Sequence, residues 1–340
     1  LDYATLTDVM INSRDPEALK GVWATWRDLG ASQRNDFQRY VELTNEAAVE
    51  KGYSDAGSLW RSDFAMPSAE LDREADHLWD SVQTIYKDLH CHVRAELAEQ
   101  YDESVIAPDE HLPAHLLGGI WSENWQGVYD RVKPFEAELE QSFDLDKALA
   151  DEFVLTDLVR ESEAFYASIG LPALPASFFA QSMIGKPADR AVDCSAQAWN
   201  INDKNDVRIS LCGKVSANQF FDINQLLGQN YYSLSYQEQP AVYRKPASPD
   251  FAEAVAGVIN LSMTPVYFRD IGLINKVDDS NEALVNRQMM LALKIFPSLV
   301  HARTVEQWRS DVFAGRIVPA RYTTSWWHPK PRHSPAVAPQ

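Results

Sequence analysis

Three side chains that can bind a metal or form hydrogen bonds are the first sign of chemistry in this sequence. Gln225 and Gln229 stand four positions apart in segment 219–235, where apolar residues recur with helical spacing. Residues four apart lie one above the other on a helix face. Two histidines at this spacing form the zinc site of the H-E-x-x-H motif, in which the glutamate is the general base. This sequence instead has Gln-Leu-Leu-Gly-Gln at 225–229, and Glu253 follows in a second apolar helical segment.

These residue types predict a hydrogen-bonded cluster rather than a metal site. An amide oxygen is a poor zinc donor beside imidazole or carboxylate. Leu226 follows Gln225, so the side chain at that position cannot take a proton from water. Amides can bridge to each other and to a carboxylate. We therefore expect Gln225, Gln229 and Glu253 to bond to one another and to hold no metal, and we expect no catalytic residue among them.

Histidines elsewhere do not form an obvious metal motif. Three of them lie in separate segments without the spacing of metal ligands, namely His111, His115 and His301. His90 and His92 flank Cys91, but side chains two apart on a helix face different ways. We therefore expect His90 and His92 to serve in packing or to lie at the surface. A divergent metallopeptidase with ligands supplied by such residues stays open as an alternative.

The elements around these residues are predicted to be helical, forming one mostly α domain. Apolar spacing predicts helices in these segments: 14–50, 68–101, 136–170 (as two helices), 219–235, 250–266, 281–300 and 304–314. Alternation in Val207-Arg208-Ile209-Ser210-Leu211 is the clearest strand signal and predicts a small β element. The Pro-rich end, 329–340, cannot continue a helix.

The charge balance excludes some classes of partner. The 340 residues include 31 Lys and Arg against 49 Asp and Glu, a formal charge of −18. An acidic protein of this kind is not attracted to nucleic acid or to an anionic membrane surface. No apolar run is long enough to span a membrane, and Leu1-Asp2-Tyr3 does not begin a signal peptide. Because the chain starts without Met, we expect an upstream segment that was removed or omitted.

Several sequence blocks together resemble one enzyme family. They are Tyr53-Ser54-Asp55-Ala56-Gly57, Pro113-Ala114-His115-Leu116-Leu117-Gly118, Ser182-Met183-Ile184-Gly185-Lys186-Pro187, Val312-Phe313-Ala314-Gly315-Arg316 and Trp326-Trp327. In residue type and in order they resemble the angiotensin-converting enzyme family of zinc peptidyl-dipeptidases, across about residues 10–328. The resemblance identifies 1–328 as a partial domain of that family, followed by the tail 329–340.

The resemblance implies a fold and a compartment. The family's domain is mainly α and two-lobed, with a deep central cleft, zinc at the floor of the cleft and a small β hairpin. Family members are secreted or membrane-anchored, so we expect an extracellular protein. They have a disulfide where this chain has Cys194 and Cys212, with 17 residues between them, which leaves Cys91 as a free thiol. The chain stops before the family's later block of lysine, histidine, tyrosine and arginine, so the resemblance covers only part of the family's domain.

The same resemblance implies that the zinc site has lost its chemistry. Gln225 and Gln229 stand where the family has its zinc-binding histidines, and Leu226 stands where it has the general base. Glu253 alone matches a ligand, and Gly257 replaces an acidic partner. The site is therefore expected to be degenerate and to bind no zinc.

Substrate-contacting positions also depart from the family pattern. Ser195 stands before Ala196, where the family has a histidine. Glu123 stands where a glutamine helps to hold the substrate's carboxylate, which the negative charge of Glu123 would repel. Ser195, Ala196 and Glu123 are the substrate-binding residues that the resemblance implies.

Two further features follow from the same comparison. Arg27 and Trp326 match residues that line a chloride site in the family, and Lys330 stands in for its second arginine. Asn260-Leu261-Ser262 is a glycosylation sequon, but it lies on an apolar helix, so we expect Asn260 in the core.

The sequence therefore predicts a secreted homologue without peptidase activity, a pseudoenzyme that binds a peptide or protein in or around the former active-site cleft. Two alternatives stay open. One is the divergent zinc peptidyl-dipeptidase with unusual ligands. The other is a structural or interaction protein that uses its outer surface.

Overall fold

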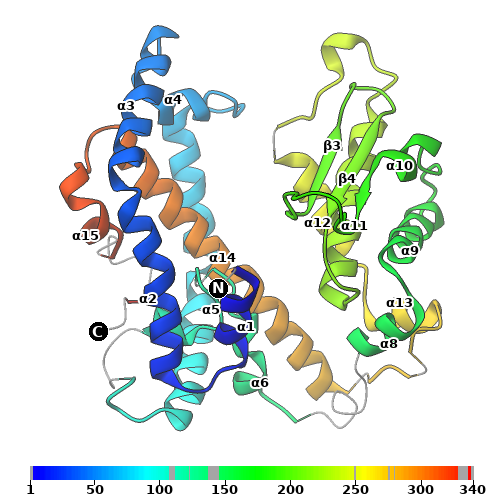
Figure 1. Ribbon diagram of the computed structural model, residues 1–340, viewed down its shortest axis with the longest axis horizontal. Helices are drawn as coiled ribbons and strands as arrows, with labels where there is room; N and C mark the ends of the chain where they lie inside the picture. The colour runs from blue at the N-terminus through cyan, green and yellow to red at the C-terminus, as the bar shows by residue number, and fades with distance from the viewer. Residues whose placement is uncertain are drawn as a thin grey trace. The chain divides into compact units, whose positions relative to one another are not determined.

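The computed structural model describes residues 3–106, 112–121, 123–136, 145–248, 250–274, 276–278, 280–327 and 336–337. The chain divides into two compact units (Figure 1). The first unit comprises Leu1–Glu136 and Ser280–Gln340, and the second comprises Ala137–Asp279. The mainly α fold predicted from the sequence is confirmed. The predicted cleft and the predicted domain limit at residue 328 stay predictions.

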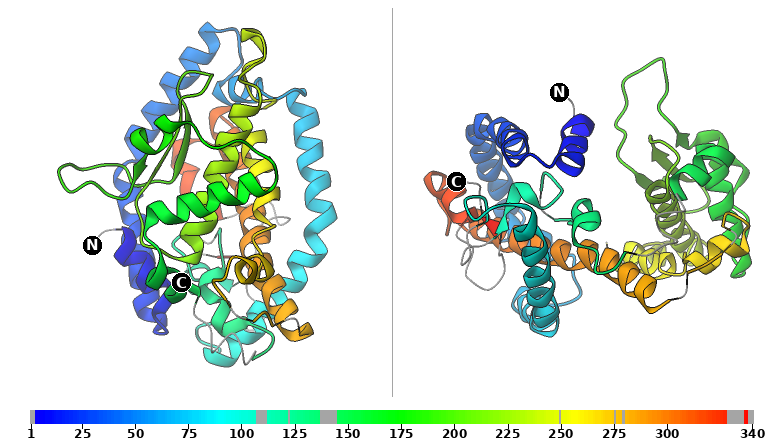
Figure 2. Two further views of the ribbon diagram at one scale, coloured as in Figure 1. Left: turned by 90° about the vertical axis from the view of Figure 1, so that its right-hand side faces the viewer. Right: turned by 90° about the horizontal axis from the view of Figure 1, so that it is seen from below.

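The first unit is built from helices on either side of the inserted second unit. They are α1 (Tyr3–Asn12), α2 (Pro16–Ser32), α3 (Arg34–Glu50), α4 (Ala56–Arg61), α5 (Ser68–Gln100), α6 (Tyr129–Val132), α14 (Asn281–Phe313) and α15 (Tyr322–Trp327). The long helices α5 and α14 pack against each other (Figure 2). Asp15 caps α2 by accepting a hydrogen bond from the Glu17 N–H at 3.0 Å, and Pro16 occupies the first position of that helix.

Apolar side chains from α2, α5 and α14 form the main core of the first unit. Leu19, Leu97 and Leu293 are fully buried there, one from each helix. A smaller cluster joins α3 to the end of α14 through Ala48 and Phe313. A short parallel pairing joins β1 (Leu112–Pro113) to β5 (Ala336–Val337).

The second unit combines helices with a small sheet. Its helices are α8 (Leu145–Glu152), α9 (Leu155–Ser168), α10 (Ala176–Gln181), α11 (Ala217–Ser235), α12 (Phe251–Asn260) and α13 (Pro265–Asp270). Its strands are β2 (Met183–Ile184), β3 (Gln197–Asn200) and β4 (Val207–Leu211), in the order β2-β4-β3. The strands β3 and β4 form the predicted hairpin, with Ala198 opposite Ile209.

The core of the second unit lies between α11, α9 and the sheet. Val207, Ile209 and Leu211 alternate toward this core, as the strand pattern predicted. From α11, Phe220 and Leu227 are fully buried against them. The helix α11 thus has one apolar face in the core, it also packs against α12, and its half-exposed residues include Gln225 and Gln229.

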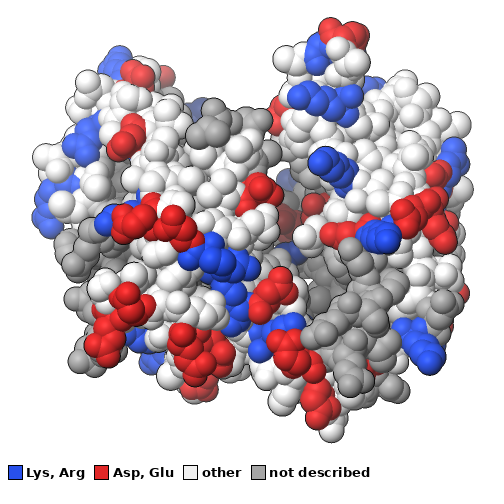
Figure 3. All heavy atoms as spheres, turned by 60° about the horizontal axis from the view of Figure 1, so that its bottom comes forward, with Lys and Arg blue, Asp and Glu red and all other residues white. Residues whose placement is uncertain are grey.

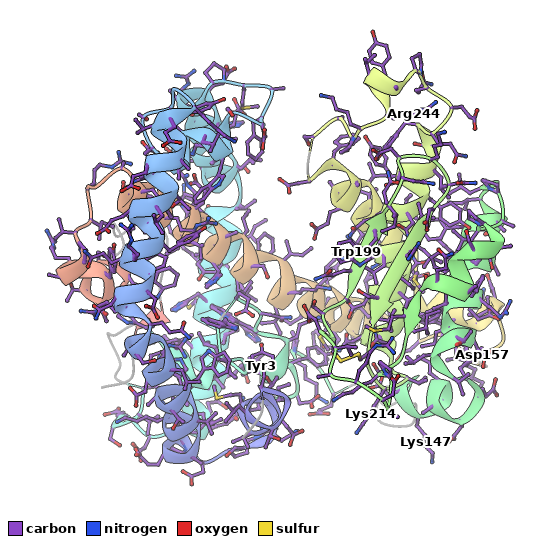
Figure 4. All side chains as sticks on the ribbon, turned by 45° about the horizontal axis from the view of Figure 1, so that its top comes forward. Tyr3, Lys147, Asp157, Trp199, Lys214 and Arg244 are labelled. Carbon is purple, nitrogen blue, oxygen red and sulfur yellow. A yellow bond between two sulfur atoms is a disulfide. The ribbon has the colours of Figure 1, made fainter. Side chains whose placement is uncertain are left out.

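A disulfide closes the segment around the hairpin. Cys194 and Cys212 are bonded, with their Cα atoms 4.9 Å apart (Figure 4, where the disulfide is drawn as a yellow bond). This is the pairing that the sequence resemblance implied. Cys91 is free and exposed on α5.

Two helix limits differ from the sequence prediction. The segment 250–266 was expected to be one helix, but α12 ends at Asn260 and α13 begins at Pro265. A residue before proline is disfavoured in helical conformation, and the Thr264 hydroxyl accepts from the Tyr267 N–H as a new cap. Segments 281–300 and 304–314 were expected as two helices, but they are continuous in α14, because His301-Ala302-Arg303 contains no helix breaker.

Charged side chains of both signs share the face shown in Figure 3. No helix in the described part of the chain is both long and apolar enough to span a membrane.

Candidate functional site

The candidate site lies where α12 crosses α11 in the second unit. Ser216 caps α11 by accepting a hydrogen bond from the Gln219 N–H at 3.1 Å. Because Ile223 and Leu227 are buried on the core side of α11, Gln225 and Gln229 fall on its half-exposed side. Their side chains are therefore available to α12 and to solvent.

A glycine allows the two helices to approach closely. A Cβ atom placed on Gly228 would lie 2.6 Å from the Ala256 Cβ and 2.5 Å from the Tyr166 hydroxyl. Such distances leave no room for any side chain at this position. The contact between Gly228 and Ala256 therefore fixes how α12 lies on α11.

This crossing brings Gln225 to the backbone of α12. The Gln225 Nε2 donates a hydrogen bond to the main-chain oxygen of Glu253 at 3.0 Å. A Cβ atom on Gly257 would stand 3.7 and 3.8 Å from the Gln225 amide atoms, which is ordinary van der Waals contact. Gln225, Glu253 and Gly257 are thus neighbours, although they are far apart in sequence.

The predicted bonds to the Glu253 carboxylate are absent. We expected this carboxylate to accept from Gln225 or Gln229, but the main-chain oxygen accepts instead, and the Glu253 side chain is exposed. Within the described segments, neither the Glu253 carboxylate nor the Gln229 amide has a hydrogen-bond partner. The main-chain oxygen of Glu253 lies within hydrogen-bond distance of the Gln225 amide, whereas the Glu253 side chain is exposed to solvent.

The residues of this site do not fit a zinc ion. Gln225 and Gln229 offer neutral amides, which are weak zinc donors, and the Gln225 amide already holds the backbone of α12. Over the residues that the structure describes, no three His, Cys, Asp or Glu side chains gather as a metal site. Leu226 is buried beside Gln225 and has no group that can act as a base.

Asparagine side chains form further hydrogen bonds between α11 and α12. The Asn224 Nδ2 donates to the Asn260 Oδ1 at 3.1 Å, and the Asn260 Nδ2 donates to the Phe221 main-chain oxygen at 3.1 Å. The Tyr166 hydroxyl donates to the Asn224 main-chain oxygen at 2.8 Å. The amide of the sequon residue Asn260 is therefore engaged at both ends and half-buried, which disfavours its glycosylation.

The predicted substrate-binding residues belong to different units. In the second unit, Ser195 and Ala196 are exposed just before β3, and the Ser195 hydroxyl accepts from the Gln197 amide at 2.8 Å. Glu123 belongs to the first unit, where its main-chain oxygen accepts from the Ser298 hydroxyl at 2.6 Å. Burial raises the pKa of the Glu123 carboxyl, while Arg27 opposes that rise. Their predicted role in substrate binding stays a prediction.

Arg27 and Trp326 of the predicted chloride site both line one pocket in the first unit. The Arg27 guanidinium lies over the Trp23 ring, 3.5 Å from its centroid, and Nη2 donates to the Ile120 oxygen at 2.7 Å. Burial lowers the pKa of Arg27 to about 10, so it is charged at neutral pH. Lys330 lies outside the described residues, and chloride binding stays a prediction.

The histidines have separate environments. His115 is buried in the first unit, and burial lowers its pKa to about 4. His301 packs against Trp326, with ring centroids 6.0 Å apart. The His92 Nε2 lies 2.6 Å from the Val132 main-chain oxygen, as expected for a packing role. His111 lies outside the described residues.

The pocket that contains Arg27 and Trp326 was not foreseen from the sequence. Its lining includes six of the ten tryptophans of the chain. The richness in tryptophan was the available signal, but these residues are spread over about three hundred positions and have no common spacing. Sequence reasoning therefore missed the pocket as a unit.

Comparisons with known proteins agree on one family. A family model described as angiotensin-converting enzyme matches residues 2–340. "Angiotensin-converting enzyme" of Rattus norvegicus is 35% identical over 327 residues, covering 95% of this chain and 25% of the relative. The protein of the same name from Theromyzon tessulatum is 34% identical over 326 residues, covering 95% of this chain and 52% of the relative. That from Haematobia irritans exigua is 31% identical, and 54% of its length is covered. The chain thus spans about half or less of the curated relatives that it matches.

Proposed function

Because the chain belongs to the angiotensin-converting enzyme family, we propose that it is a member without peptidase activity that binds a peptide or protein at the α11–α12 surface and does not cut it. The α11–α12 surface is defined here by Gln225 and Gln229 of α11 and by Glu253 and Val258 of α12, none of which is fully buried. The disulfide supports an oxidising, extracellular setting for this function.

One observation carries the proposal, namely the bond from the Gln225 amide to the Glu253 main-chain oxygen. Gln225 and Gln229 have the spacing of the two histidines of a zinc motif, but the Gln225 amide forms a hydrogen bond that joins α11 to α12. A zinc peptidase needs the metal to polarise the scissile carbonyl and to lower the pKa of the attacking water. It also needs a base, and Leu226 cannot serve as one. Hydrolysis by the family mechanism therefore has no support at this site.

Binding is supported by what the surface exposes. On and after α12, Val258 is 69% exposed and Leu261 is 58% exposed, and Phe251 is 46% exposed. The same two helices carry the exposed Glu253 carboxylate and the half-buried Gln229 amide, which has no hydrogen-bond partner among the described residues. Exposed apolar groups together with free hydrogen-bonding groups are typical of surfaces that bind peptides or proteins.

Zinc content and peptide cleavage test the loss of activity. We expect protein purified without a chelator to hold no zinc and to release no dipeptide from a blocked tripeptide. The double variant Gln225→His, Gln229→His is expected to gain zinc, because Glu253 stands beside residue 225. The single variant Gln225→His is the matched control and should gain little. Stoichiometric zinc in the unmodified protein would contradict the proposal and favour the divergent metallopeptidase.

A peptide panel tests the binding part and separates it from the outer-surface alternative. Affinities are measured by fluorescence polarisation on the unmodified protein and on two variants. Val258→Glu places a charge on the α11–α12 surface and should weaken binding at least tenfold. Leu291→Glu changes a residue of α14 that is also exposed, at 41%, and should leave affinity unchanged. Unchanged affinity in Val258→Glu together with weaker binding in Leu291→Glu would show that the peptide binds at another surface.

A further inference from the structure

A second candidate site lies wholly within the first unit, and it does not depend on the α11–α12 surface. It is a pocket of about 640 Å³ between α2, α14 and α15, with Tyr86 of α5 and the loop around Trp121 completing its wall. Cavities of roughly 300–1,000 Å³ are typical of small-molecule sites. The volume is far larger than a single ion requires, so it favours an organic ligand.

The walls of this pocket are mostly indole rings. The tryptophans that line it are Trp23, Trp121, Trp125, Trp308, Trp326 and Trp327. Trp308 and Trp326 meet edge to face, with ring centroids 5.8 Å apart. Aromatic walls in such arrangements bind other flat apolar rings, because stacked and edge-to-face contacts add to the burial of apolar surface. The pocket therefore favours a ligand with an aromatic body.

Unpaired donors define the polar end of the ligand. Arg27 lines the pocket, and no carboxylate in the described segments lies within 4.0 Å of its guanidinium. Two of its hydrogen bonds go to main-chain oxygens, those of Trp23 and Ile120. A guanidinium has five N–H donors, so others are free for a ligand. Glu123 attracts Arg27 electrostatically, but it does not line the pocket.

Trp23 supplies a second donor. Its side chain is only 6% exposed, and its Nε1–H has no hydrogen-bond partner among the described residues. A buried donor without a partner is unfavourable, because it has lost its hydrogen bonds to water and gained none in the protein. A ligand oxygen that accepts from this N–H would recover that cost. Both donors call for an acceptor, and the positive charge of Arg27 favours an anionic one.

We propose that this pocket binds a small aromatic carboxylate, with its ring among the tryptophans and its carboxylate on the Arg27 guanidinium and the Trp23 Nε1–H. The other charged groups of the lining are Asp28 and Arg34, which are exposed. Because one is acidic and the other basic, their charges offset each other, and the Arg27 guanidinium is the charge that the half-buried part of the lining offers to an anion. This binding goes beyond the predicted chloride site, since chloride has no ring for the tryptophans to contact.

Isothermal titration calorimetry of the full chain tests the proposal. Indole-3-acetate is the probe. Indole and acetate represent its two halves and are titrated separately, and chloride is titrated as the competing anion. We expect indole-3-acetate to bind with 1:1 stoichiometry, and indole and acetate to bind at least tenfold more weakly. Binding of chloride without any binding of indole-3-acetate would overturn the proposal. An affinity for neutral indole equal to that for indole-3-acetate would also overturn it.

Variants locate the binding. Arg27→Gln should weaken indole-3-acetate at least tenfold, while Trp23→Phe keeps an aromatic ring, removes the N–H and should weaken binding severalfold. Arg39→Gln is the matched control, because Arg39 is an exposed arginine outside the pocket, paired with Glu42. Circular dichroism verifies that each variant is folded. Unchanged affinity in folded Arg27→Gln protein would also overturn the proposal.

Discussion

At the scale of single residues, His115 is a buried side chain that is kept neutral by its surroundings. It is 5% exposed, and its Nδ1 has no hydrogen-bond partner among the described residues. Burial is the main cause of its low pKa, and Lys20 adds a smaller repulsion of the charged form. A group of this kind links the stability of the fold to pH.

We expect stability to fall as the solution is acidified through the range set by His115. Its pKa falls from the ordinary value of 6.5 to about 4 in the folded protein. Well above pH 6.5 the imidazole is neutral in both the folded and the unfolded chain, so its burial does not lower the free energy of unfolding there. Between about pH 6.5 and 4 the unfolded chain binds a proton that the folded chain does not, and up to on the order of 3 kcal/mol is lost. Urea denaturation at several pH values measures this loss.

Two histidine variants isolate the effect of His115. His115→Leu should make the free energy of unfolding less dependent on pH in this range. His77→Leu is the control, because His77 lies exposed on α5, and this variant should keep the original pH dependence. Identical pH profiles for His115→Leu and the unmodified protein would contradict the assignment.

Residue types predicted part of the candidate site. The position of Gln225 on a helix face followed from its apolar neighbours, and its amide does form a hydrogen bond to residue 253. The sequence could not predict that the acceptor is the main-chain oxygen and not the carboxylate. That choice depends on the distance between two helices, which local spacing does not encode.

At the scale of elements, the crossing of α11 and α12 depends on Gly228. We expect Gly228→Ala to lower the free energy of unfolding by about 1–3 kcal/mol, because the new methyl group would overlap Ala256 and the Tyr166 hydroxyl. Because α12 must shift to make room, the contact between Gln225 and the Glu253 backbone should also be disturbed. Chemical denaturation followed by circular dichroism measures the change.

A second glycine provides the control for this substitution. Gly257→Ala lies on the same pair of helices, but its methyl group would make only ordinary contacts with Gln225. Since alanine is a better helix former than glycine, this variant should be neutral or more stable by up to about 1 kcal/mol. Equal destabilisation by both variants would show that space at the crossing is not the cause.

The limits of the elements show what local sequence can predict. The helix α11 was expected at 219–235 and is observed at Ala217–Ser235, since its apolar spacing and its cap agree. The break between α12 and α13 was missed, because the apolar pattern continues through Leu261 and Met263 while Pro265 starts a new helix. Apolar periodicity predicts which face is buried, whereas turns depend on the chemistry of a few residues.

At the scale of the whole molecule, the disulfide belongs to one unit only. Cys194 and Cys212 lie in the second unit, whose core is separate from the cores of the first. We expect reduction to destabilise the second unit by on the order of 3 kcal/mol, since an open loop gains entropy in the unfolded chain. The first unit should be unaffected. Hydrogen exchange of peptides from α11 and from α5, with and without reductant, measures both effects.

Cysteine variants control for side reactions. Cys194→Ser with Cys212→Ser should reproduce the effect of reductant. Cys91→Ser removes the free thiol of α5 and should change neither unit. Equal loss of protection in α5 and α11 would mean that the two units unfold together.

Sites assembled from distant parts of the chain were the least predictable. The aromatic pocket combines residues from Trp23 to Trp327, and its lining includes His301 and Tyr86. None of these positions shares a motif or a period, so only the folded chain brings them together. The α11–α12 site was easier to find, because its residues lie within two neighbouring helices.

The division of the chain has a consequence for how the protein is made. Among the described residues, the buried core of the second unit runs from Leu149 to Ile274, whereas the main core of the first includes Leu293 and Val300 as well as residues up to Val132. Since domains fold as units during synthesis, the second unit can finish folding before the first, because the last part of the first unit, from Ser280 onward, leaves the ribosome after it. The apolar segments of the early helices must then wait on the order of ten to thirty seconds for their last partners at the usual rate of translation. During that interval we expect chaperones to bind these exposed apolar segments.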